Sequence, residues 1–142
     1  MAVAVAALTL TATALAGGEG WLTNYPKALA QAKAEKKLLL IDFTGSDWSQ
    51  AAQKQAAEVF STKEFKDYAA KNLVLLEVDS PRAKELPAEL TEHNRELVSR
   101  FGIRTYPTIV LLDGEGQEQS RFVSYGGGGA AKVIAKIDAF RE

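Results

Sequence analysis

Two short apolar runs dominate the pattern of hydrophobic and polar positions along the chain. Residues 38–43 read LLLIDF, and residues 73–79 read LVLLEVD. Neither run alternates, and each is shorter than a typical helix, which favours strands buried on both faces of a sheet. Because the segment between them has helical spacing, the two strands are expected to run parallel. We therefore predict a parallel pair at the centre of the sheet.

Helical spacing of apolar residues marks the segments on either side of the first run. Before it, Thr23 or Asn24 is placed to cap a helix, and Pro26 falls in the first turn, where a missing N–H costs nothing. After it, residues 49–60 carry apolar side chains at helical spacing, among them Ala56. Both segments are predicted to be helices that pack on the sheet.

Three further helices are predicted downstream. Ser61 begins an S-x-x-E capping-box pattern and opens a helix that ends near Lys71. Residues 88–101 form the next helix, and Gly102 supplies its C-terminal stop. The apolar face of the last helix consists of Val133, Ile134, Ile137 and Phe140.

The remaining signals belong to strands at the edges of the sheet. Residues 109–112 form an apolar strand, DGEG at 113–116 is a hairpin turn signal, and residues 117–123 pair back antiparallel. With a short edge strand at residues 21–22, the order becomes βαβαβαββα. This order predicts an α/β fold with a central mixed β-sheet flanked by helices on both faces. We expect a single domain over residues 17–142.

Residues 1–16 are apolar and small, and they carry no charge. They end in Ala14-Leu15-Ala16, an A-x-A pattern typical of signal-peptide cleavage, although a basic n-region is missing. We interpret them as a signal peptide, which implies a periplasmic or extracellular protein. The alternative is a frayed N-terminal helix or strand, and the protein is then cytoplasmic.

Composition removes several functional classes. Seventeen basic and eighteen acidic residues leave a charge of −1 without any basic block, which argues against a nucleic-acid partner. No stretch approaches about 20 apolar residues without turn signals, so no membrane span is expected in the mature chain. The absence of cysteine excludes disulfides and thiol catalysis, and a single histidine, His93, excludes a histidine-rich metal site. No cofactor is predicted.

Three motifs follow one another along the chain. The first is the apolar strand at 38–43 followed by GSDW at 45–48, and the second is FGIR at 101–104 before YPT at 106–108. The third is the strand, Asp-Gly turn, strand and terminal helix that come after. On these motifs the chain resembles the thioredoxin-like superfamily over residues 21–142. It is most similar to exported bacterial members with an extended loop before the active-site helix.

The resemblance implies a thioredoxin-like fold, a cis-proline at Pro107 before the edge hairpin, and a catalytic Cys-x-x-Cys motif. Here that motif reads SQAA, with Ser49 in place of the attacking cysteine and Ala52 in place of the resolving one. A serine hydroxyl has no comparable thiolate state near neutral pH, and an alanine methyl cannot resolve a mixed disulfide. Disulfide exchange by this chain is therefore excluded on chemical grounds.

Ser49 has two other interpretations. With His93 as a base and Asp42 behind it, Ser49 would be a hydrolytic nucleophile, but no G-x-S-x-G elbow is present and His93 lies on a separate helix. The alternative is a helix N-cap, a role that serine fills well. Ala52 is expected to fill the core, and His93 to be solvated or partly packed.

By resemblance, Asp42 matches the buried carboxylate that shuttles a proton for the resolving cysteine of the family. No thiol remains here for it to serve. Since a buried charge without a partner is costly, we expect Asp42 to be structural, and to be hydrogen-bonded, hydrated or protonated.

The resemblance also implies a groove that binds an extended peptide. A cis-proline loop at Tyr106-Pro107 would expose backbone for pairing, and Trp48 would form the rim beside Ser49 and Gln50. Three functions stay open. The first is a redox-inactive binding or chaperone-like module for peptides or unfolded protein segments. The second is a thiol-disulfide oxidoreductase family member whose cysteines were lost or replaced, and the third is a purely structural domain.

Overall fold

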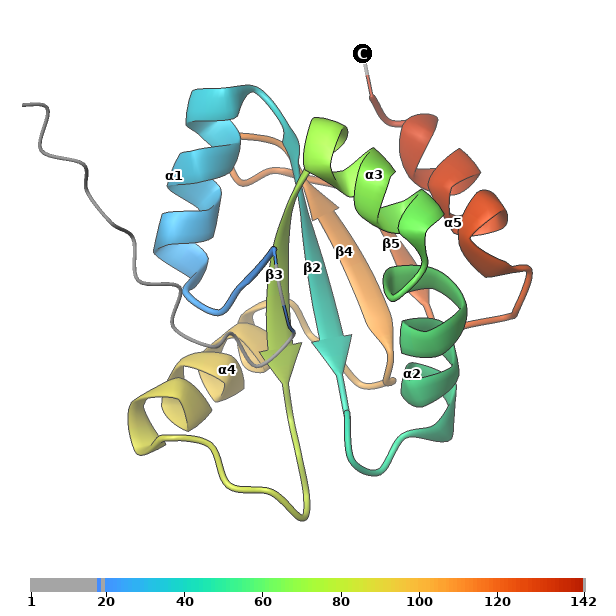
Figure 1. Cartoon of the computed structure of the whole chain (residues 1–142). Helices are drawn as coiled ribbons and strands as arrows, with labels where there is room; N and C mark the ends of the chain where they lie inside the picture. The colour runs from blue at the N-terminus through green and yellow to red at the C-terminus, as the bar shows by residue number, and fades with distance from the viewer. Residues whose placement is uncertain (1–17, 19, 142) are drawn as a thin grey trace, which may run out of the picture.

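A computed structural model describes residue 18 and residues 20–141, so the predicted signal peptide at residues 1–16 lies outside the described residues. In chain order the elements are β1 (Trp21–Leu22), α1 (Tyr25–Glu35), β2 (Leu38–Thr44), α2 (Gln50–Gln55), the π-helical turn η1 (Ala56–Phe60), α3 (Lys63–Asn72), β3 (Leu73–Asp79), α4 (Ala88–Arg100), β4 (Thr108–Leu112), β5 (Glu118–Val123) and α5 (Gly129–Asp138) (Figure 1). None of the helices described combines the length and apolar character that crossing a bilayer requires.

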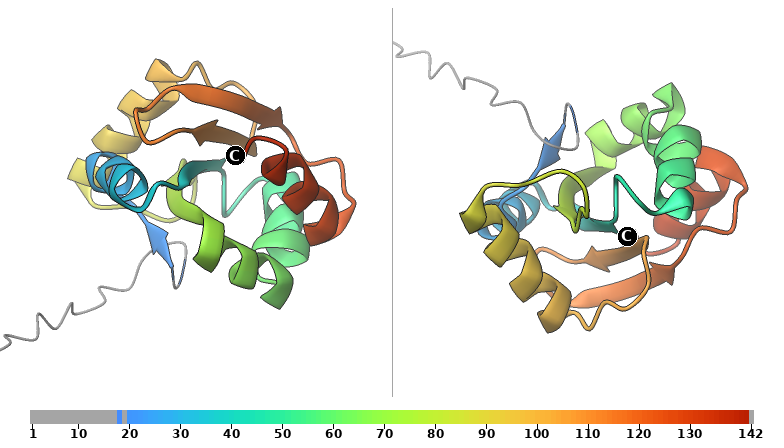
Figure 2. Two further views of the ribbon diagram at one scale, coloured as in Figure 1. Left: turned by 90° about the horizontal axis from the view of Figure 1, so that it is seen from above. Right: turned by 90° about the horizontal axis from the view of Figure 1, so that it is seen from below.

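The strands form one mixed sheet in the order β1-β3-β2-β4-β5. β2 and β3 run parallel, as predicted, with Leu40 opposite Leu75. β4 runs antiparallel to β2, and β5 pairs back on β4 as the predicted hairpin. Figure 2 shows α1 and α4 on one side of this twisted sheet and α2, α3 and α5 on the other. The predicted mixed sheet with helices on both faces is confirmed.

Successive residues of the central strands supply two separate cores. Leu40 and Leu75 pack under α3 and α5 with Phe65, whereas Leu39 and Ile41 pack under α1 and α4. Because side chains alternate across a strand, a strand covered on both faces needs apolar residues at nearly every position. This requirement accounts for the unbroken run of residues 38–43.

Two helix starts test the capping predictions. The Asn24 side chain accepts a hydrogen bond from Lys27 N–H at 3.0 Å, so Asn24 is the cap of α1. The cap of α3 is Thr62, whose hydroxyl accepts from Phe65 N–H at 3.2 Å, and the prediction of Ser61 was wrong. The reason is that Ser61 still belongs to the preceding helix, because its N–H donates to Ala56 O at 2.9 Å.

The segment predicted as one helix over residues 49–60 divides into α2 and the π-helical turn η1. A π turn adds one residue to the helical repeat and rotates the positions that follow it. Ala56, which lay on the predicted apolar face, is therefore exposed, while Gln55 is buried together with Val59 and Phe60.

Candidate functional site

A tight loop joins the end of β2 to the start of α2. Ser49 N–H donates to Gly45 O at 2.8 Å, and the loop lays the indole of Trp48 against Gly45. A Cβ at position 45 would come within 2.3 Å of the Trp48 ring, so only glycine fits there. This packing sets the position of Trp48 beside the first turn of α2.

Ser49 is the N-cap of α2. Its Oγ accepts from Ala52 N–H at 3.2 Å and donates to Tyr106 O at 3.3 Å, and the residue is buried. Neither contact involves a base, and Ser49 Oγ makes no hydrogen bond to His93 or Asp42 in the part of the chain described. The contacts match the N-cap interpretation and not the hydrolytic one. Ala52 is buried, as expected.

The loop before β4 comes to lie beside the start of α2. The Tyr106–Pro107 peptide bond is cis. The ring of Tyr106 meets the ring of Trp48 edge to face, with 5.6 Å between the centroids. Gln50 is exposed in the first turn of α2, and Pro107 is buried. Two segments more than fifty residues apart thus bring together the residues singled out from the sequence.

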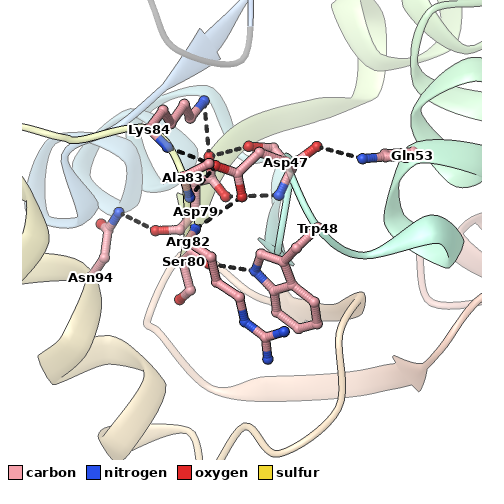
Figure 3. A network of polar contacts seen from close by, with 10 residues as sticks. Asp47, Trp48, Gln53, Asp79, Ser80, Arg82, Ala83, Lys84 and Asn94 are labelled. Carbon is pink, nitrogen blue, oxygen red and sulfur yellow. Dashed lines mark hydrogen bonds and ion pairs between the residues drawn. The ribbon is translucent and has the colours of Figure 1, made fainter.

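The loop after β3 covers Trp48 (Figure 3), and sequence reasoning did not predict this contact. Trp48 Nε1–H donates to Ser80 O at 2.8 Å, and the guanidinium carbon of Arg82 lies 3.7 Å from the centre of the Trp48 ring. Arginine over an indole face is a favourable cation–π contact. Trp48 is consequently half-buried, with one ring face already occupied.

Asp47 ties the same two loops together. Its carboxylate accepts the backbone N–H groups of Arg82, Ala83 and Lys84 at 2.9, 2.8 and 2.8 Å. These hydrogen bonds, above all those from Arg82 and Lys84, lower the pKa of Asp47. Asp79 adds a second link, because it accepts from Ser46 N–H at 3.0 Å and pairs with Lys84 Nζ at 3.1 Å. Figure 3 shows both carboxylates between the loops.

A chain of hydrogen bonds joins α1, α4 and β3 behind these loops. His93 Nε2 accepts from Tyr25 N–H at 3.0 Å, so its proton sits on Nδ1, which lies 2.8 Å from Asn94 Oδ1. Asn94 Nδ2 then donates to Asp79 O at 3.0 Å. His93 is thus half-buried and bonded through both ring nitrogens. An asparagine on the inward face of α4 was the available sequence signal.

Replacing Asn94 with alanine is expected to lower the free energy of unfolding by about 1–3 kcal/mol, because the buried Asn94 side chain no longer bonds His93 Nδ1 and the Asp79 carbonyl. Urea unfolding monitored by circular dichroism measures the loss. Arg95→Ala is the matched control, since Arg95 is exposed and pairs only with Glu92 across one helical turn, and it should change stability by less than about 0.5 kcal/mol. Equal losses in the two variants would contradict the role given to Asn94.

Two carboxyl groups are buried below α2. Asp42 on β2 lies opposite Glu77 on β3, and the two residues are 7% and 8% exposed. Burial, followed by the charges of Glu77 and Asp79, raises the pKa of Asp42 well above its usual range. Burial and the charge of Asp79 raise the pKa of Glu77 to about 7, against a smaller opposing effect of Lys84. Of the three states expected for Asp42, this environment favours the protonated one.

Metal ligation has no basis in this arrangement. Within residues 18 and 20–141, no three carboxylate or imidazole side chains gather as a metal ion would require. The surface formed by Trp48, Ser49, Gln50, Tyr106 and Pro107 carries no thiol. Its polar side-chain groups are the capping hydroxyl of Ser49, the exposed amide of Gln50, the phenol of Tyr106 and the indole N–H of Trp48, which donates to Ser80 O.

Comparison with known proteins agrees with the fold. A model of the thioredoxin-like domain matches residues 25–140. The chain is 34% identical to the disulfide bond reductase DsbH of Chlamydia pneumoniae over 110 residues, which is 78% of this chain and 66% of that protein. It is 31% identical to the thioredoxin-related protein DsbJ of the same organism over 75% of this chain and 30% of that protein. The chain therefore spans less than two thirds of either relative.

Solved structures give the same result. A DsbH oxidoreductase superposes with a TM-score of 0.78 at 31% identity, over 84% of this chain and 82% of that one. A thioredoxin from Thermus thermophilus, at 21% identity and a TM-score of 0.64 over 84% of each chain, shares the fold. The family match covers the motifs noted in the sequence, including the segment where SQAA replaces the two cysteines. The chain belongs to the thioredoxin-like family.

Proposed function

We propose that this chain is a redox-inactive thioredoxin-like domain that binds extended peptides or unfolded protein segments. The proposed contact surface consists of Trp48, Ser49, Gln50, Tyr106 and Pro107. The observation that carries the proposal is the edge-to-face contact of Trp48 and Tyr106 beside the cis peptide bond, next to a helix start that has no thiol. Aromatic side chains supply a large contact area at low entropic cost, which suits recognition of varied segments.

Backbone geometry supports the same proposal. Tyr106 N–H has no hydrogen-bond partner among the described residues, and Tyr106 O receives only the long 3.3 Å bond from Ser49. An extended peptide gains most of its affinity from pairing with such open main-chain groups, while side chains select among sequences. A peptide strand could therefore add to the loop at Tyr106 with Trp48 and Gln50 beside it.

A second function rests on the relatives. DsbH is described as a disulfide bond reductase, and this chain keeps the scaffold of that family without its sulfur. We propose descent from a thiol-disulfide oxidoreductase whose cysteines were lost or replaced. In this case the chain would still contact the substrates of its ancestor without catalysing the reaction. A purely structural domain is the remaining alternative, and it predicts no binding at the Trp48 surface.

Export is part of the proposal and rests on the sequence alone. The small apolar residues 1–16 end in an A-x-A pattern, which is the form that signal peptidase cleaves. The mature unit would then be the single domain over residues 17–142. N-terminal sequencing of the protein expressed with its full leader tests this directly, and a chain that keeps Met1 would contradict it.

Peptide binding is expected to shift the NMR signals of the Trp48 indole and of the Ser49 and Tyr106 amides, because these groups line the proposed surface. A set of unstructured peptides without cysteine serves as the probe. Trp48→Ala should weaken binding about tenfold, the effect of losing about 1.4 kcal/mol of contact energy. Phe140→Ala is the matched control, since Phe140 is an exposed aromatic beyond α5. Absent or scattered shifts would favour the purely structural alternative.

A further inference from the structure

The strongest unassigned feature is a cavity of about 430 Å³ between α2 with its π turn and the ends of β2 and β3. Asp42, Thr44 and Glu77 contribute polar groups to it, and Trp21, Ala52 and Phe60 contribute apolar surface. Gln53, Ala57 and Ser61 also line the cavity and are exposed, so it opens to solvent along the outer side of the helix. The proposed peptide surface at Trp48 and Tyr106 does not take part in it.

Two oxygens in this cavity lack partners. Asp42 Oδ1 and Glu77 Oε2 are inaccessible and accept no hydrogen bond from any residue that the structure describes. Because Asp42 and Glu77 face each other in the β2–β3 register, both side chains stand on the same face of the sheet. Buried acceptors are normally satisfied, so the pair marks a place where a hydrogen-bond donor is missing.

Once Glu77 is ionised, charge favours a cation as the missing donor. Asp42, Glu77 and Asp79 bring three carboxyl groups to one region, and Lys84, the only base paired there, is bound to Asp79 at 3.1 Å. The described residues of β1 and α2 that line the cavity, Trp21, Ala52 and Gln53, bear no charge. Among the described residues, no cationic side chain forms an ion pair with Asp42 or Glu77.

The residues that line the cavity determine which kind of cation it can bind. A metal ion needs more ligands than these two carboxyls provide, and Asp79, the third carboxyl of the region, already accepts from Ser46 and pairs with Lys84. An ammonium group carries three donors and can serve both carboxyls at once. A short alkyl chain behind it would lie against Trp21, Phe60 and Ala52. We propose that this cavity binds a primary ammonium group on a short apolar chain, held by Asp42 and Glu77.

The protonation of Asp42 and Glu77 predicts how the affinity for the ammonium group changes with pH. Glu77, whose pKa is raised to about 7, must lose its proton to hold a cation. The groups that face it are Asp42, Asp79 and Lys84, and the packed face of α2 adds no titratable side chain. An alkylammonium ion stays charged throughout this range. Its affinity is therefore expected to rise as pH increases from about 6 to about 8.

The test is an NMR titration of the full chain with n-butylammonium chloride, read at the indole N–H of Trp21. A saturable shift is expected, and butan-1-ol or sodium chloride at the same concentrations should give none. Glu77→Gln should weaken binding at least fivefold, and Glu64→Gln, at an exposed site, should not change it. Ala56→Leu, at an exposed position that lines the cavity, should also abolish binding while leaving the fold intact.

The source of the ammonium group is resolved by a second probe, Nα-acetyl-lysine N-methylamide. A shift with both probes assigns the site to a lysine side chain as well as to free amines, and a shift with butylammonium alone restricts it to free amines. No saturable shift at Trp21, or one that survives both Glu77→Gln and Ala56→Leu, overturns the proposal. Equal displacement by magnesium chloride would replace it with a metal site. Peptide binding is measured at the indole of Trp48, and ammonium binding is measured at the indole of Trp21. A negative result at one indole therefore does not change the conclusion drawn at the other.

Discussion

Ser49→Cys combined with Ala52→Cys is expected to create a disulfide reductase activity that the present chain lacks. Ser49 Oγ already sits at the start of α2 and accepts Ala52 N–H, so a sulfur at that position would receive the same stabilising contact. Helix N-termini lower thiol pKa values, and a fall from about 8.5 to about 7 raises the thiolate fraction at pH 7 from about 3% to about 50%. Because nucleophilicity falls with thiol pKa, attack on a disulfide should then run about threefold faster than with an ordinary thiol.

Insulin reduction with dithiothreitol as the electron source measures this gain. Ser49→Cys alone should form a mixed disulfide and stop, because the alanine at position 52 cannot resolve it. Ala52→Cys alone should stay nearly inert, since position 52 is buried. A double variant that forms its internal disulfide yet reduces insulin no faster than dithiothreitol alone would show that the surface around Trp48 no longer admits a substrate.

Glu77→Gln is expected to reduce the pH dependence of stability between about pH 4.5 and pH 7. The pKa of Glu77 is raised from 4.5 to about 7 in the folded state, so the folded chain binds more protons than the unfolded one. The contribution of a raised pKa is therefore fully present below pH 4.5 and is lost as pH rises through about 7. At about 1.4 kcal/mol for each pH unit, the loss is on the order of 3 kcal/mol.

Urea unfolding at intervals from pH 4.5 to pH 8 tests this expectation. The parent chain should become less stable along the series, and Glu77→Gln should show a smaller decrease, because Asp42, whose pKa is also raised, keeps its own share. Glu64→Gln removes an exposed carboxyl and should follow the parent curve. Asp42→Asn should also reduce the decrease, and its effect should start at about pH 4, because the pKa of Asp42 is raised well above its usual range. Parallel curves for the parent and Glu77→Gln would refute the buried-pair interpretation.

Both predictions concern the start of α2, where Ala52 lines the same cavity as Asp42 and Glu77. The family's chemistry uses a thiol here, and this chain keeps the helix start and the buried carboxyl while the cysteine positions hold Ser49 and Ala52. A carboxyl that serves no thiol and finds no hydrogen-bond partner destabilises the folded state unless another group compensates it. The proposed ammonium site would supply that compensation.

Much of the fold followed from local patterns. The unbroken apolar runs predicted β2 and β3 and their parallel pairing, and the Asp-Gly turn at 113–114 predicted the hairpin. Such signals work because burial on one or both faces imposes a period that a single segment displays. The cap at Ser61 was wrong because a π turn is a local irregularity without a composition of its own.

Only part of the candidate site could be predicted from such local patterns. Trp48, Ser49 and Pro107 were identified through their motifs. The contact of Arg82 with the Trp48 ring and the hydrogen bonds from the loop after β3 to Asp47 were not predicted. These contacts join residues more than thirty positions apart through irregular loops. No periodic pattern predicts the path of such loops. A charged loop has the same sequence features whether or not it is held by tertiary contacts.

By itself, the sequence determined the fold class, the family and the absence of thiol chemistry, since these depend on residue type and on spacing within one segment. Only the tertiary structure decided that Asp42 and Glu77 form a pair. They are neighbours because β2 and β3 pair with Asp42 opposite Glu77, and a slip of one residue would place Glu77 on the other face of the sheet. Register is a property of two strands together, so neither strand reveals it alone.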